Sequence, residues 1–124
     1  MTSTRWLFVA LMTIGLGTAS GARERLQVLA SPRVSYAPGN LTIRAIVDPN
    51  EAHRAIQVVA DSGDYVRSSE VQLDGVRAPR VTVFEFDNVP TGIYAVTAAL
   101  KDSRGDVLAR VDEQVRVIES ARGN

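Results

Sequence analysis

The C-terminal third of the chain carries its clearest pattern of hydrophobic and polar positions. Residues 93–100 are uncharged and largely apolar, and in residues 107–118 apolar side chains recur at nearly every second position. A two-residue period is typical of a β-strand that buries one face. The polar segment between them, residues 101–106, contains Gly105 and two aspartates, which favour a tight turn. The pattern predicts a β-hairpin.

Shorter runs of the same kind precede this hairpin, and Pro, Gly, Asn and Asp residues separate them about every ten positions. One of these runs is interrupted at Ser68 and Ser69, which predicts a short, broken edge strand. No segment after residue 22 shows the period of a helix. The predicted strands span residues 26–30 with a continuation at 34–36, 41–47, 55–60, 65–73, 81–86, 93–100 and 107–118. The spacing predicts an all-β fold, a single antiparallel sandwich of about seven strands.

The run 81–86 differs from the others because both of its faces are apolar. Phe84 and Phe86 lie on one face, whereas Val81 and Val83 lie on the other. Such a strand is predicted to occupy the middle of a sheet, or to contain a bulge that changes which face is buried.

The N-terminal segment has the composition of a secretory signal peptide. Arg5 precedes a short apolar run, residues 6–12, and small residues follow as far as Ala22. We expect cleavage after Ala22, with Ser20 as an alternative, and a retained membrane anchor as the other interpretation. The run is shorter than the roughly 20 apolar residues that span a membrane. The sequence thus predicts a signal peptide over residues 1–22 and one sandwich domain over 23–124, exported to the periplasm or the extracellular space.

Charge and cysteine content narrow the classes of function. The chain has 14 basic and 14 acidic residues, whereas a nucleic-acid-binding protein usually shows a basic excess. It has no cysteine, so it has no disulfide, no thiolate metal ligand and no cysteine nucleophile. We therefore expect no nucleic-acid partner and a domain held together by its hydrophobic core.

A local motif links the chain to known modules. Pro90, Gly92, Tyr94, Val96 and Ala98 form a Pro/Gly turn that leads into a strand whose first inward residue is a tyrosine. This arrangement resembles the immunoglobulin-like and fibronectin type III-like modules of bacterial exported proteins. The resemblance implies an immunoglobulin-like sandwich, with the Tyr94 hydroxyl bonded to nearby backbone as a tyrosine corner.

The sequence offers little catalytic or metal-binding chemistry. His53 is the sole histidine, and since no nucleophile motif accompanies it, we expect a solvated loop residue. The segments 61–64 and 102–106 contain pairs of aspartates, but they lack the ligand spacing of an EF-hand and suit tight turns. The tripeptide Arg104 to Asp106 spells an integrin-recognition motif, which we also interpret as part of a turn. We predict no catalytic residue, no metal and no cofactor.

The strand 93–101 provides the candidate binding surface. Its bulkier side chains should point into the core, so the opposite set faces solvent and carries no charge before Lys101. The strands 55–60 and 107–118 should flank it. The predicted protein-binding face consists of Val59, Ile93, Ala95, Thr97, Ala99 and Leu108. The outer side of the other sheet, with Thr42 and Arg44, is expected to be more polar.

These observations favour a non-enzymatic exported protein that binds another envelope or secreted protein. A second copy of the chain is another occupant of the same face, and no stable membrane span is expected after signal cleavage. The alternative is a carbohydrate- or surface-adhesion module, which needs exposed aromatic rings and has Tyr36 and Tyr65 for that purpose. An enzyme without a recognisable motif would need a polar pocket at His53.

Export is directly testable. N-terminal sequencing of the mature protein should give a start near Arg23, because the small-residue site ends at Ala22. Recovery of the intact chain beginning at Met1 in the membrane fraction would instead identify an uncleaved anchor.

Overall fold

The computed structural model describes residues 25–120, which form two β-sheets and no α-helix. Besides strands and loops, these residues contain one three-residue 3-10 turn, Gly75–Arg77. The strands are β1 (Gln27–Ser31), β2 (Val34–Tyr36), β3 (Gly39–Ile46), β4 (Ala55–Asp61), β5 (Val66–Gln72), β6 (Val81–Val89), β7 (Gly92–Lys101) and β8 (Val107–Ile118). The predicted all-β sandwich is confirmed.

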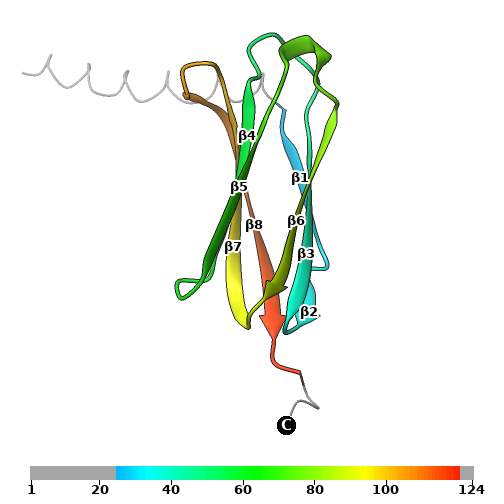
Figure 1. Ribbon diagram of the computed structural model, residues 1–124, viewed down its shortest axis with the longest axis vertical. Helices are drawn as coiled ribbons and strands as arrows, with labels where there is room; N and C mark the ends of the chain where they lie inside the picture. The colour runs from blue at the N-terminus through cyan, green and yellow to red at the C-terminus, as the bar shows by residue number, and fades with distance from the viewer. Residues whose placement is uncertain (1–24, 121–124) are drawn as a thin grey trace, which may run out of the picture.

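The two sheets stack face to face (Figure 1). The smaller sheet has the order β1-β3-β6, and the larger has the order β2-β8-β7-β4-β5. The paired strands are antiparallel, except that β2 runs parallel to β8. As expected, β4 and β8 flank β7 in the larger sheet.

The first predicted strand divides between the two sheets. Gln27 to Ser31 pairs with β3 in the smaller sheet, whereas Val34 to Tyr36 pairs with β8 in the larger one. Pro32 lies between the two strands and has no N–H to offer a ladder. The chain therefore leaves one sheet at this proline and joins the other.

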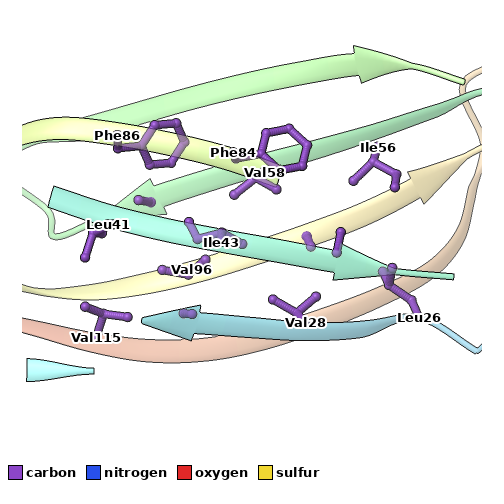
Figure 2. Packing of buried hydrophobic residues seen from close by; sticks show 14 of the residues in the cluster. Leu26, Val28, Leu41, Ile43, Ile56, Val58, Phe84, Phe86, Val96 and Val115 are labelled. Atoms are coloured by element: carbon purple, nitrogen blue, oxygen red, sulfur yellow. The ribbon is translucent and has the colours of Figure 1, made fainter. Parts of the chain in front are cut away.

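The inward faces of both sheets supply a continuous hydrophobic core (Figure 2). Ile43 from β3, Ile56 and Val58 from β4, and Val96 from β7 are wholly buried, and Phe84 from β6 is nearly so. Burial of each such side chain contributes roughly 1.5–3 kcal/mol. With no cysteine in the sequence, this core is the main source of stability.

Two predictions about individual strands are corrected. β6 lies at the edge of its sheet rather than in the middle. It does contain a bulge, but the bulge comes after the predicted run 81–86. Leu41 pairs with Phe86 whereas Gly39 pairs with Val89, so β6 has one extra residue near Asn88. Asn88 has a positive φ of 57°, which this bulge accommodates. β5 is an edge strand as predicted, but it is continuous through its two serines.

Tyr94 ties the start of β7 to the preceding turn. Its side chain is wholly buried, and its hydroxyl donates a hydrogen bond of 2.7 Å to the Pro90 carbonyl. The ring also meets Tyr65 edge-on, with centroids 6.3 Å apart. Burial raises the pKa of the Tyr94 hydroxyl above its ordinary value of 10.0, with a smaller opposing effect from a hydrogen bond with Ser62. The tyrosine thus joins β7 to the β4–β5 hairpin.

Gly92 makes room for this arrangement. A Cβ at Gly92 would lie 2.9 Å from the Ser62 Cβ and 3.2 Å from Cε1 of Tyr94. The first distance is shorter than real carbon contacts, so any larger residue would push the β4–β5 hairpin away from β7. Glycine in the turn before Tyr94 is therefore needed for close packing against Ser62 and Tyr94, in addition to its part in the turn.

Replacing Tyr94 with phenylalanine should lower the free energy of unfolding by about 1 kcal/mol, because the Pro90 carbonyl loses its donor. A second effect should appear in alkali. The folded state holds the Tyr94 proton more tightly than the unfolded state, so stability is unaffected below pH 10 and falls as the pH rises above it.

Urea titrations at neutral pH and at successive pH values above 10 would measure both effects in the wild type and in Tyr94→Phe. The variant should lose the part of the alkaline decline that Tyr94 causes. Tyr36→Phe is the matched control, because Tyr36 is exposed and its substitution should change stability by less than about 0.5 kcal/mol. Equal stability of wild type and Tyr94→Phe would contradict the structural role of the hydroxyl.

Candidate functional site

The outer face of β7 is a strip of small, uncharged residues along the middle of the larger sheet. Ile93 is 60% exposed and Ala95 is exposed, while Thr97 and Ala99 are half-buried between their neighbours. Val59 of β4 lies directly opposite Thr97 and is also half-buried. We call these five residues the β7 strip. They lie together on one face, because β7 alternates inward and outward with a period of two.

Polar side chains border the β7 strip on both sides. The outward residues of β8 that pair with β7 are Arg110, Asp112, Gln114 and Arg116. On the other side, β5 presents Ser68, Glu70 and Gln72, and its one apolar residue on this face is Val66, which is 55% exposed. The Thr97 hydroxyl donates a hydrogen bond of 2.9 Å to Oδ1 of Asp112, so this border contacts the strip itself.

Leu108, the sixth residue of the predicted face, lies apart from the other five. The β7–β8 register shifts where Lys101 pairs with Val107 but Leu100 pairs with Ala109, which leaves Leu108 as the unpaired residue. Its side chain is half-buried and packs against the core. A strict two-residue period from Val107 onward could not anticipate this bulge.

A more hydrophobic corner continues the strip toward β2. Val34 and Ile93 both lie beside Arg116 of β8, one on each side, and Tyr36 lies beside Ile118. Val34 is 52% exposed and Tyr36 is 59% exposed. The sequence did not indicate this corner, because it depends on the pairing of β2 with β8 at the other end of the chain.

Tyr36 and Tyr65, the two aromatic residues considered for ligand contact, have different environments. Among residues 25–120, Tyr36 carries the exposed aromatic ring. Tyr65 is half-buried, with its ring against Tyr94, and its hydroxyl accepts a hydrogen bond of 3.2 Å from Nη1 of Arg67. Only Tyr36 is therefore placed to meet a ligand with its ring.

The outer face of the smaller sheet is less polar than expected. Thr42 and Arg44 do lie on it, but Leu29 and Val83 lie on either side of Arg44 and are 52% and 47% exposed. Val81 is exposed in the next row of the same face. The prediction considered β3 alone, and the two partners of β3 add these apolar side chains to the face.

His53 is buried, with only 3% of its surface exposed, which corrects the expectation of a solvated loop residue. The next residue explains the burial. The Arg54 N–H bonds to the Lys101 carbonyl, and the Arg54 carbonyl accepts a bond from the Leu73 N–H, so the segment continues the sheet. A pocket of about 230 Å³ lies elsewhere and is lined by Arg25, Gln27, Ile46, Val47, Asp48 and Arg80. Neither His53 nor a serine lines that pocket.

The two aspartate-containing turns use carboxylates to hold their own backbone. Oδ1 of Asp61 accepts a bond of 2.8 Å from the Gly63 N–H. Oδ1 of Asp102 accepts bonds of 2.9 and 3.0 Å from the N–H groups of Arg104 and Asp106. These are turns, as predicted. In the part of the chain that the structure describes, no three His, Cys, Asp or Glu side chains gather in a group that could hold a metal ion.

Residues 25–120 contain no helix that is long and apolar enough to cross a membrane.

No protein-family model matches the sequence, and a search of curated proteins gives no significant match. Solved structures share the fold. The PKD domain of an M14-like peptidase from Thermoplasmatales archaeon SCGC AB-540-F20 matches with a TM-score of 0.52 and 13% identity, over 76% of this chain and 93% of that one. The sporulation control protein Spo0M from Bacillus subtilis matches with a TM-score of 0.50 and 11% identity, over 78% of this chain and 50% of that one.

The CARDB domain of a Pyrococcus furiosus protein, solved in complex with di-metal ions, is also similar, with a TM-score of 0.48 and 16% identity over 78% of this chain and 96% of that one. The PKD domain, which matches with the higher TM-score, is an immunoglobulin-like β-sandwich module. The chain therefore has an immunoglobulin-like β-sandwich fold, as predicted. At these identities the similarity concerns the fold, and function has to be argued from the surface.

Proposed function

We propose that the protein is a non-enzymatic, exported module that binds another envelope or secreted protein through the β7 strip and the adjoining corner of Val34 and Tyr36. The observation that carries this proposal is the uncharged outer face of a central strand, bordered by polar side chains. Protein interfaces have this arrangement, with few charges at the centre and a polar rim that remains hydrated.

The corner beside Arg116 strengthens the proposal. Tyrosine and arginine are enriched among the residues that dominate binding energy, because each combines a large contact area with hydrogen-bonding groups. Here Tyr36 is more than half exposed, and Arg116 lies between the apolar side chains of Val34 and Ile93. These groups would supply the strong contacts, while the small side chains of the β7 strip allow a partner to approach closely.

Export and the absence of catalysis are part of the same proposal. The sequence of residues 1–22 supports export, and PKD- and CARDB-type domains are compatible with an extracellular role. The buried His53 and the turn-bound carboxylates of Asp61 and Asp102 leave these groups poorly placed for catalysis. The features of the surface therefore support a binding role better than an enzymatic one.

A carbohydrate-binding role is the second candidate, and the exposed ring of Tyr36 favours it. A sugar would stack on this ring and leave the distant end of the β7 strip uncovered. Substitutions at the two ends therefore separate the candidates. Ala99→Arg should disturb a protein partner only, whereas Tyr36→Ala should disturb both kinds of ligand.

Binding can be measured after cross-linking the protein in an envelope extract, identifying the captured protein and purifying it. Ala99→Arg should weaken the affinity for this partner by at least about 30-fold, or ~2 kcal/mol, because a long charged side chain would project from the uncharged β7 strip into the contact with the partner. Val76→Arg is the matched control, since Val76 is 64% exposed on the 3-10 turn and should bind like the wild type.

Circular dichroism shows whether Ala99→Arg is folded, so that a loss of binding can be distinguished from a loss of structure. A folded Ala99→Arg variant with undiminished affinity would show that the β7 strip is not the contact surface. Binding of soluble glycans that depends on Tyr36 but not on Ala99 would favour the carbohydrate-binding role.

A further inference from the structure

β6 is the least protected of the four sheet edges. β2 is only three residues long and lies between Pro32 and Pro38, and β1 ends at Ser31, directly before Pro32. β5 carries Arg67, which points inward toward the Phe86 ring. Short length, proline and inward charge all hinder the addition of another strand. β6, by contrast, spans nine residues without a proline or a basic side chain.

The hydrogen-bond pattern shows which backbone groups of β6 are available. The Arg80 carbonyl accepts a bond of 3.0 Å from the N–H of Val47, the residue that follows β3. In an antiparallel ladder, alternate residues make these bonds, so Thr82, Phe84 and Phe86 bond to β3. The N–H and C=O groups of the residues between them point away from the sheet.

Arg67 limits this free edge at one end. Its Nη1 donates a hydrogen bond of 3.1 Å to the Asp87 carbonyl, which belongs to the outward-pointing set. The bulge near Asn88 then ends the regular pairing. Residues 81–85 remain available, with outward backbone groups at Val81, Val83 and Glu85. The side chains of the two valines are 44% and 47% exposed.

We infer that this edge pairs with the same edge of a second copy of the chain, in an antiparallel arrangement centred on Val83. Val83 then faces Val83 of the second copy, while Val81 faces Glu85 and Glu85 faces Val81. Each facing pair exchanges two backbone hydrogen bonds, and the two small sheets become one six-stranded sheet.

The chemistry of the edge fits a second copy because it complements itself. The two-fold arrangement places apolar Val83 against apolar Val83, and it never places one glutamate opposite another, which would be destabilising. It also brings the exposed Val83 of one copy next to that of the other on a continuous outer face, on which Leu29 lies farther out, beyond Arg44. The β7 strip lies on the other sheet, so this dimer leaves the proposed partner-binding surface open.

The oligomeric state and the exchange rates of individual amides test this inference on the wild-type protein. Light scattering after size-exclusion chromatography should give twice the monomer mass as concentration rises. Over the same range, exchange of the Val83 and Glu85 amides should slow by at least about tenfold, because these edge amides become hydrogen-bonded. The Phe84 amide should be protected at every concentration, since it bonds to β3.

Val83→Lys should keep the protein monomeric, because it places two ammonium groups opposite each other. Val76→Lys, at an exposed site away from the edge, and Ala99→Arg, on the other sheet, should both dimerise like the wild type. A constant monomer mass with unchanged Val83 and Glu85 exchange would overturn the inference. A dimer that withstands a folded Val83→Lys would overturn it as well, and the wild-type amide data decide the question even if that variant does not fold.

Discussion

The alternation of side chains along β7 is the constraint on which the rest of the structure depends. Tyr94, Val96, Ala98 and Leu100 are wholly buried and meet the inward faces of the other sheet. A shift of one residue would move all four to the solvent, so the register of the larger sheet is strongly specified. The hydrogen bond from the Tyr94 hydroxyl to the Pro90 carbonyl holds the start of β7 against the preceding turn. With the inward set fixed, the outward set is fixed as well.

Function in such a sandwich is confined to faces, edges and loops, because the interior is filled with side chains. The two proposed surfaces use different chemistry on different sheets. The β7 strip offers small apolar side chains with a polar border, whereas the β6 edge offers unpaired backbone groups between Val81 and Glu85. A protein of this kind could bind a partner through one sheet while pairing with itself through the other.

Patterns within single strands could be predicted from the sequence, and contacts between distant strands could not. The two-residue period located β7 and β8, and the motif around Tyr94 indicated the sandwich. The pairing of β2 with β8, which places Tyr36 beside Ile118, depends on segments about 80 residues apart. The burial of His53 likewise depends on distant segments, because the neighbouring Arg54 forms backbone hydrogen bonds with Leu73 and Lys101, at the ends of β5 and β7.

Single cysteines offer the most direct test of the central claim, that alternate residues of β7 face the core and a partner. The natural chain has no cysteine, so each introduced thiol reports one position. Ala95→Cys should react rapidly with a maleimide in the isolated protein and slowly when the purified partner is bound, whereas Ala98→Cys should react only as the protein unfolds. Equal reactivity at the two positions, or Ala95→Cys labelling that the bound partner leaves unchanged, would contradict the account.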